Sequence, residues 1–172
     1  MRAAPWLRLP WHLCRGLTSL LLLRAQPYRG PCTVEEGGEL LRAGAHLLVC
    51  GGEPLRDVLG ARLSLLLPPS GLAFFSSGHC QSLPELLSLA ELDAEEARRL
   101  EAVAVLDREA LDTVANFTSF LRHLESSAVR AKGTVDVVVL TSDYHARRVR
   151  CIAALLLAAR GLSFQVAQAL LG

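Results

Sequence analysis

The residues of this chain best suited to chemistry lie in one polar stretch, from Thr141 to Arg148. The stretch follows a β-branched and apolar run, Val137–Leu140, which is typical of a strand buried on both faces. Turn and N-cap residue types then open a helix that begins with Tyr144 and His145. Histidine moves protons near neutral pH, and arginine binds anions. We therefore predict a site for a negatively charged ligand at the start of this helix.

Helical periodicity indicates which cations of this helix face the site. His145 falls on the apolar face formed by Val149, Ile152, Ala153, Leu156 and Leu157. Arg148 lies about 60° to one side of it, and Arg147 points roughly the opposite way. An arginine in the first turn opposes the helix dipole at about 0.3–1 kcal/mol, a cost that a bound anion would remove. The alternative is a capped helix with a basic surface cluster and a structural histidine.

Other polar candidates follow other predicted strands. They are Gly51 and Gly52, the Ser77-Gly78-His79 turn, Asp107, and the pair Thr113 and Asn116. Each has a purely structural alternative: a tight turn for the glycines, a turn residue for Asp107, and a helix N-cap for Asp112 or Thr113. The sequence has no GxGxxG fingerprint, no GxxxxGK[ST] loop and no GxSxG elbow, and Ser142 lies too close to His145 to form a nucleophile–base pair.

The predicted elements alternate between strand and helix. Strands are expected at residues 46–50, 72–75, 103–106, 137–140 and 162–167, and helices at 39–43, 55–67, 83–92, 94–100, 112–128 and from 144. Such alternation predicts a Rossmann-like, three-layer α/β fold with a mostly parallel sheet of about five strands and helices on both faces. Ligands bind at the carboxyl ends of the strands in these folds, which is where the polar candidates fall.

Two further helices are expected to bury apolar faces. The helix at 55–67 is expected to bury Leu55, Val58, Leu59, Leu63 and Leu66, and the helix at 112–128 to bury Val114, Phe117, Leu121 and Leu124. The capping-box pair Asp93 and Glu96 starts the helix at 94–100. Cys50 and Cys151 lie in apolar runs and are expected to be core thiols.

Charge divides the chain into two parts. Residues 1–34 hold five arginines and no acid, whereas the remainder holds 13 basic and 17 acidic residues. The body is therefore not expected to bind nucleic acid. The basic arm carries Trp6, Trp11 and Tyr28, and three interpretations stay open: a segment resting on an anionic membrane, an organelle-targeting peptide, or an N-terminal helix packed on the domain. Five scattered cysteines favour neither a disulfide framework nor a zinc site, and a reducing compartment is the simplest interpretation.

Together these residues resemble the bacterial YdcF/SanA/ElyC-like family, a widespread domain of unknown function. The resemblance covers roughly Ala45–Ala167. Its last motif, T-S-x-Y-H-x-x-R, is complete in Thr141, Ser142, Tyr144, His145 and Arg148. Earlier motifs correspond to Leu47–Gly52, Arg56, Ser77-Gly78-His79, and the segment with Asp107, Ala110, Asp112, Thr113 and Asn116. His79, Ala110 and Asp112 depart from the family's glycine, serine and asparagine, and Glu85 matches its acidic helix only loosely.

The resemblance implies a Rossmann-like fold with a polar pocket at the strand ends, and a role in cell-envelope biogenesis at a membrane. We expect a phosphorylated or nucleotide-like anion as the ligand, contacted by the residues named above. If the protein is an enzyme, phosphoryl or pyrophosphoryl chemistry is expected, with His145 or Asp107 as acid or base. The alternatives are a non-catalytic membrane-surface module that acts through residues 1–34, and a methyl-donor or nucleoside-cofactor site. No motif indicates a particular cofactor. The last predicted strand ends close to Gly172, so a further C-terminal segment is expected.

Overall fold

A computed structural model describes residues 31–126, 136–157, 160 and 162–169. The hypotheses about the basic arm concern residues 1–30, which lie outside the described residues. The last residues of the predicted arm belong to the α/β domain instead. Strand β1 (Pro31–Cys32) pairs with the strand β6 (Ser163–Ala169), and Thr33 caps the helix that follows.

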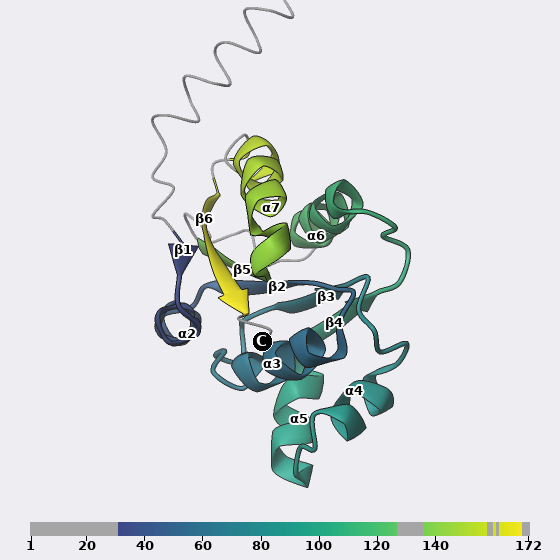
Figure 1. The fold of residues 1–172 in the computed structure, drawn as a ribbon. Helices are drawn as coiled ribbons and strands as arrows, with labels where there is room; N and C mark the ends of the chain where they lie inside the picture. Colours follow the sequence, from purple (N-terminus) through teal and green to yellow (C-terminus); the bar gives the residue numbers. More distant parts are fainter. Residues whose placement is uncertain (1–30, 127–135, 158–159, 161, 170–172) are drawn as a thin grey trace, which may run out of the picture.

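The sheet is parallel throughout the described strands (Figure 1). Its order is β1-β6-β5-β2-β3-β4. The other four strands of the sheet are β2 (His46–Cys50), β3 (Ala73–Ser76), β4 (Ala104–Asp107) and β5 (Asp136–Ser142). Strand β2 is buried at every position, as the apolar sequence HLLVC predicts.

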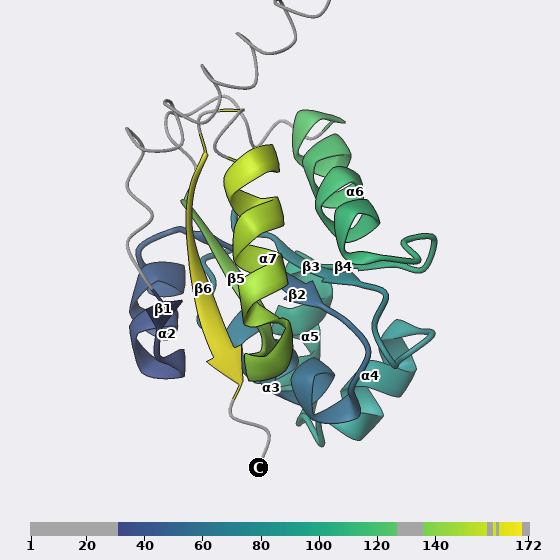
Figure 2. The same cartoon turned by 45° about the horizontal axis from the view of Figure 1, so that its top comes forward.

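Helices cover both faces of this sheet, which confirms the predicted three-layer α/β architecture (Figures 1 and 2). One face packs against α2 (Val34–Arg42), α3 (Pro54–Ser64), α4 (Leu83–Leu89) and α5 (Ala94–Val103). The other packs against α6 (Thr113–Ser126) and α7 (Asp143–Leu156). None of the helices in the described part of the chain is long and apolar enough to cross a membrane.

Side chains that alternate along the strands pack into two separate hydrophobic cores, one on each face of the sheet. In β2, Leu47 and Val49 join the core under α2–α5, whereas Leu48 and Cys50 join the core under α6 and α7. Phe74 of β3 meets Phe120 of α6 edge-on, with ring centroids 5.7 Å apart. The two cores fix the strands on both sides, so that the polar ends of the strands are held at one edge.

Three residues that are expected in the core are exposed instead. Leu55 is 63% exposed and Val114 is 49% exposed, and Cys151 is also exposed, whereas Cys50 is buried as predicted. The helix α3 begins at Pro54 and turns Arg56 and Asp57 inward, so Leu55 faces solvent. Apolar periodicity misses this orientation because it assigns charged side chains to the surface.

The first elements of the domain are not predicted from the sequence, although the sequence contains a signal for them. Helix α2 begins at Val34, well before the predicted helix at 39–43, and strand β1 was not expected. Thr33 and Glu36 form a capping box, with Glu36 N donating to Thr33 Oγ1 and Thr33 N donating to Glu36 Oε2. The T-x-x-E pattern predicts this start, but the two glycines at 37 and 38 weaken the helical pattern after it.

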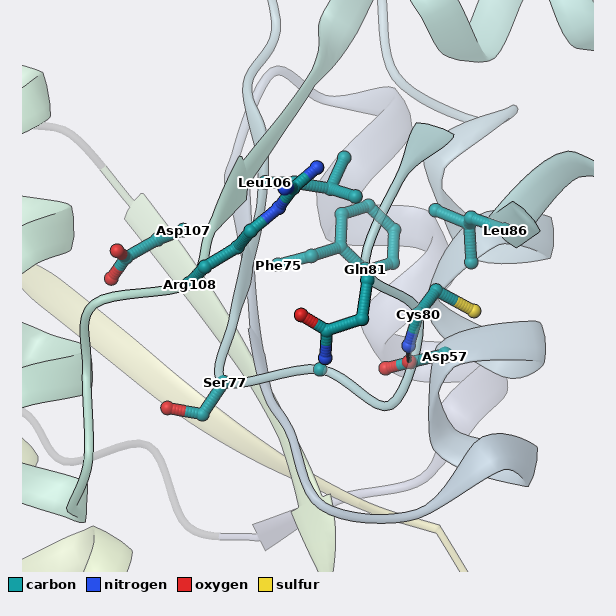
Figure 3. A pocket seen from close by; sticks show the side chains of 10 residues that line it. Asp57, Phe75, Ser77, Cys80, Gln81, Leu86, Leu106, Asp107 and Arg108 are labelled. Atoms are coloured by element: carbon teal, nitrogen blue, oxygen red, sulfur yellow. Dashed lines mark hydrogen bonds between the residues drawn. The ribbon is translucent and has the colours of Figure 1, made fainter. Parts of the chain in front are cut away.

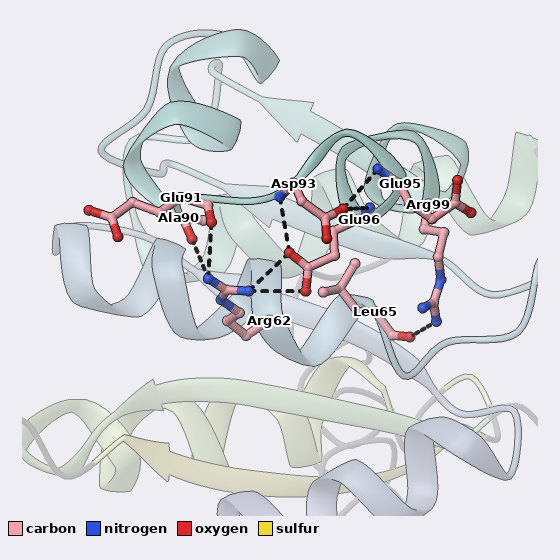
Figure 4. A network of polar contacts seen from close by, with 8 residues as sticks. All are labelled: Arg62, Leu65, Ala90, Glu91, Asp93, Glu95, Glu96 and Arg99. Atoms are coloured by element: carbon pink, nitrogen blue, oxygen red, sulfur yellow. Dashed lines mark hydrogen bonds and ion pairs between the residues drawn. The ribbon is translucent and has the colours of Figure 1, made fainter.

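A polar network joins α3 to the turn between α4 and α5 (Figure 4). Arg62 donates to both oxygens of Glu96 at 3.2 Å and to the carbonyl oxygen of Ala90 at 2.8 Å. Glu96 is also the second half of the predicted capping box with Asp93, which is confirmed. These contacts hold α5 against α3 on the side of the sheet opposite to α7.

The strand order reverses between β2 and β5. From β2 the chain runs outward through β3 to β4, and then returns to β5 on the other side of β2. A reversal of this kind opens a crevice at the carboxyl ends of the two strands, because their following helices lie on opposite faces. Helix α3 follows β2 and helix α7 follows β5, each on its own face.

Candidate functional site

A pocket of about 240 Å³ lies at this reversal. It is bounded by the carboxyl ends of β2 and β5, the β3–α4 turn, and the first turns of α6 and α7, and we refer to it as the α7 pocket. The predicted site residues that line it are Gly51, Gly52, Arg56, Ser77, Thr113, Asn116, Thr141, His145 and Arg148. Residues from four separate segments of the chain thus meet at one place, as expected for the carboxyl ends of parallel strands.

Arg56 forms part of the pocket floor and is only 1% exposed. Its Nη1 donates to the carbonyl oxygens of Cys50 and of Gly51, the latter at 2.6 Å. Its Nη2 donates to Ser142 Oγ at 2.7 Å. No described carboxylate lies within ion-pair distance, and no described acceptor meets its Nε. Within the described part of the chain, the floor therefore carries a buried positive charge without a carboxylate partner.

Thr141 adds a second unsatisfied group to the pocket. The residue is 0% exposed, and its Oγ1 has no hydrogen-bond partner among the described residues. It belongs to β5 rather than to the turn that its residue type suggested, and its side chain lines the pocket. Buried hydroxyls are nearly always hydrogen-bonded, so an unpaired one beside a pocket points to a missing partner there.

Arg148 and His145 contact each other at the mouth of the pocket. Arg148 Nη2 lies 2.9 Å from His145 Nδ1. Arginine has no acceptor, so Nδ1 accepts this hydrogen bond and the neutral ring carries its proton on Nε2. Partial burial lowers the pKa of His145, and the Arg148 and Arg56 charges lower it further, whereas Glu53 opposes them. The histidine is therefore held toward its neutral form.

The N-terminus of α7 is aimed at the same pocket. Ser142 is the N-cap residue, but its side chain makes no capping hydrogen bond, and its Oγ accepts from Arg56 instead. Asp143 Oδ1 accepts from the Tyr144 N–H at 2.7 Å. The helix is 14 residues long, so its first turn presents a developed dipole and backbone N–H groups.

Two glycines allow the β2–α3 turn to form the pocket wall. A Cβ on Gly51 would lie 1.9 Å from the Ser77 carbonyl oxygen, so only glycine permits this close contact between the two turns. Gly52 has a φ of 117°, in the left-handed region that favours glycine. The contact at Gly51 and the conformation of Gly52 both support the tight-turn alternative.

The opposite wall comes from the β3–α4 turn and α6. Ser77 has a φ of 55° and its Oγ donates to the Ala110 carbonyl oxygen or to Asn116 Oδ1, the latter at 2.9 Å. Asn116 is buried, whereas Thr113 is half-buried and lines the pocket. Asp112, and not Thr113, caps the helix, because its Oδ1 accepts from the Ala115 N–H at 2.8 Å. Thr113 is thus left facing the pocket.

The other predicted site residues lie outside this lining. Ser142 is buried against Arg56, and Tyr144 is 61% exposed with its hydroxyl donating to Glu53 Oε1 at 2.6 Å. Gly78 and Asp107 line a neighbouring pocket instead (Figure 3). Asp107 Oδ1 accepts from the Glu109 N–H and Oδ2 from Ser76 Oγ, both at 3.0 Å. These contacts match the turn-residue alternative for Asp107, and His145 lines the other pocket.

Sequence reasoning missed several residues of the α7 pocket. Leu111 lines it and is 93% exposed, and Val149 and Cys50 line it as buried apolar groups. Burial raises the pKa of the Cys50 thiol to about 12, with Arg56 and Asn116 opposing the rise, so the thiol is an inert wall group. No local pattern identifies Leu111, because an exposed leucine in a loop is common on protein surfaces.

Known proteins provide no further identification. No protein-family model matches the chain, and neither a curated protein nor a solved structure matches it. Among the described residues, no group of three histidine, cysteine, aspartate or glutamate side chains is arranged to hold a metal ion. Fold and pocket geometry therefore carry the functional argument.

Proposed function

We propose that this protein binds a small phosphorylated anion, such as a nucleotide-like phosphate, in the α7 pocket. The observation that carries the proposal is Arg56, a guanidinium that is 1% exposed and has no described carboxylate within ion-pair distance. Buried charges are normally paired, because removing an ion from water costs several kcal/mol. An anion above the pocket floor would supply the missing negative charge.

Donors around the pocket suit a phosphate group. Arg148 offers further N–H donors at the mouth, Thr141 Oγ1 offers an unpaired hydroxyl, and the first turn of α7 offers backbone N–H groups. One charge-assisted contact to arginine is worth about 1.5–3 kcal/mol. This exceeds the cost of about 0.3–1 kcal/mol for placing Arg148 near the helix N-terminus.

The chain's family and chemistry are part of the same proposal. We infer a YdcF-like domain with a role in the cell envelope, supported by the motif from Thr141 to Arg148, of which Thr141, His145 and Arg148 line the α7 pocket. If the bound ligand reacts, His145 is the group suited to proton transfer in phosphoryl or pyrophosphoryl chemistry, because its neutral ring keeps a proton on Nε2. Asp107 has no contact that supports the same role.

Calorimetric titration with pyrophosphate tests the proposal. We expect Arg148→Ala to weaken binding by about tenfold to a hundredfold, the equivalent of one charge-assisted contact. Arg147→Ala is the matched control, because Arg147 is an exposed arginine on the same helix that does not line the pocket. Equal binding by both variants, or no binding by the unaltered protein, would rule out the anion site.

A further inference from the structure

A second pocket of about 200 Å³ adjoins the first (Figure 3). Its polar lining residues are Asp57, Ser77, Cys80, Gln81, Asp107 and Arg108, and we refer to it as the Asp57 pocket. Ser77 lines both pockets, so the two meet at the β3–α4 turn.

Asp57 is a buried carboxylate that lacks a complete set of partners. It is 1% exposed, and its Oδ2 accepts from the Cys80 N–H at 3.0 Å. Its Oδ1 has no hydrogen-bond partner among the described residues, and no described basic side chain lies within ion-pair distance. Asp57 lies in the first turn of α3, where the helix dipole favours its charge, but the dipole supplies no donor to Oδ1.

The other groups at this pocket make it electronegative. Asp107 adds a second carboxylate, and Arg108 is the opposing charge but is exposed. Burial raises the pKa of the Cys80 thiol to about 11, and the negative charges of Asp57 and Glu85 and a side-chain hydrogen bond to Asp57 add to the rise. A group that enters this pocket is favoured if it carries both a hydrogen-bond donor and a positive charge.

We propose that the Asp57 pocket binds an ammonium group, with Asp57 Oδ1 as the acceptor. Together with the proposed function, on which this step rests, it defines the ligand as a phosphorylated amine: the phosphate occupies the α7 pocket and the amine reaches past Ser77 to Asp57. A hydroxyl would satisfy Oδ1 but would leave the carboxylate charge uncompensated. An ammonium group would donate a hydrogen bond to Oδ1 and would also compensate the carboxylate charge.

Amide NMR of the full chain tests the ammonium site by itself. Ethylammonium chloride is added and compared with sodium chloride at the same ionic strength. We expect a saturating shift of the Cys80 amide signal, because this N–H shares the Asp57 carboxylate with the bound ammonium. Asp57→Asn should abolish the shift. Glu101→Gln, which removes an exposed carboxylate on α5, should preserve it.

Two results overturn the ammonium site: the same shift with sodium chloride, or an undiminished shift in Asp57→Asn. Should Asp57→Asn fail to fold, Gly78→Ala provides a second variant. Its added Cβ would lie 3.0 Å from Asp57 Oδ2 and would crowd the carboxylate. The ethylammonium shift should then be weakened, and an unchanged response would count against the site.

Calorimetry with ω-aminoalkyl phosphates tests whether one ligand spans both pockets. Chains of increasing length are compared with the alkyl phosphates of the same length. At the matching length we expect the amine to tighten binding by about tenfold or more, and Asp57→Asn to remove that gain while inorganic phosphate binds as before. No gain at any length, with phosphate still bound, would contradict the phosphorylated amine.

The two proposals fail in different ways. If phosphate does not bind but ethylammonium still shifts the Cys80 amide, the proposed function is wrong and the ammonium site remains. If phosphate binding depends on Arg148 but the Cys80 amide does not respond to ethylammonium, the ammonium site is wrong and the anion pocket remains.

Discussion

Arg56 holds the pocket together and also supplies its positive charge. Its planar guanidinium reaches the carbonyl oxygens of Cys50 and Gly51 and the hydroxyl of Ser142, so it joins the end of β2 to the end of β5. A lysine could not make this set of contacts, because its ammonium group lacks the rigid fork. Arg148, by contrast, is exposed at the pocket mouth, where its Nη2 donates to His145 Nδ1.

His145 gives the anion site a predicted pH dependence. Its pKa is lowered, mainly by partial burial and then by Arg148 and Arg56. A bound anion favours the protonated ring and raises that pKa, so binding takes up a proton. Sulfate, which does not titrate near neutral pH, should therefore bind more tightly as the pH falls from about 8 toward 6, by at most about tenfold per pH unit for one linked proton.

Calorimetric titration with sulfate across this range measures the effect, and His145→Gln serves as the non-titrating variant. We expect the variant to bind sulfate with a flatter pH profile. Identical profiles for the two proteins would mean that His145 does not face the bound anion.

At the element scale, the site depends on two turns that touch through their backbones. The β2–α3 turn and the β3–α4 turn meet where Gly51 approaches Ser77, and the Gly51 N–H donates to the Ser76 carbonyl oxygen at 2.7 Å. This contact sets the distance between the wall formed by the β2–α3 turn and the wall that carries Asn116. The pocket shape therefore depends on a position that has no side chain.

Gly51→Ala should damage both the fold and the pocket. The added Cβ would meet the Ser77 carbonyl carbon and oxygen at about 2 Å, and relieving that overlap must shift backbone. We expect a loss of about 1–3 kcal/mol in the free energy of unfolding, the range for forcing atoms into a packed interior, measured by urea denaturation. Gly37→Ala is the control, because its nearest atom would lie at an ordinary 3.4 Å and alanine favours the helix. Equal stabilities of the two variants would contradict the close contact.

At the scale of the whole molecule, much of the fold could be predicted from the sequence. The strand predicted at residues 46–50 has the observed bounds, and Gly51, Asn116 and Arg148, which are predicted to meet at the strand ends, line one pocket. Both predictions follow from local patterns and from parallel topology, which together fix where strand ends meet.

The features that could not be predicted from the sequence depend on tertiary contacts that no local pattern encodes. Arg56 and Asp57 are adjacent charged residues that a sequence places at the surface, yet both are buried. They turn inward because Arg56 donates to carbonyl oxygens of the preceding turn and to the distant Ser142 hydroxyl, and because the Cys80 N–H donates to Asp57. Leu55 is consequently exposed, and the Asp57 pocket went unpredicted.

The buried His46 predicts how the stability of the whole domain depends on pH. Burial lowers its pKa, and its Nδ1 accepts the Leu72 N–H at 3.1 Å, so the folded state holds it neutral. The unfolded chain protonates His46 near pH 6.5 and thus binds more protons than the folded state at lower pH. The free energy of unfolding should fall as the pH is lowered through 6.5, by at most about 1.4 kcal/mol per pH unit from this residue.

Urea denaturation at a series of pH values measures this slope. His46→Gln keeps a hydrogen-bond acceptor but does not titrate, so its stability should fall less steeply between about pH 6.5 and 5. A slope in His46→Gln equal to that of the unaltered protein would show that His46 protonates equally in both states.

The most direct test of the central claim is amide NMR of the full chain during titration with pyrophosphate. Binding in the α7 pocket should shift the amide signals of Gly51, Gly52 and the first turn of α7 at His145, with one common dissociation constant. The amides of α5, on the opposite face of the sheet, should stay unchanged. Shifts confined to other surfaces, or no saturating shift at the α7 pocket, would contradict an anion site there.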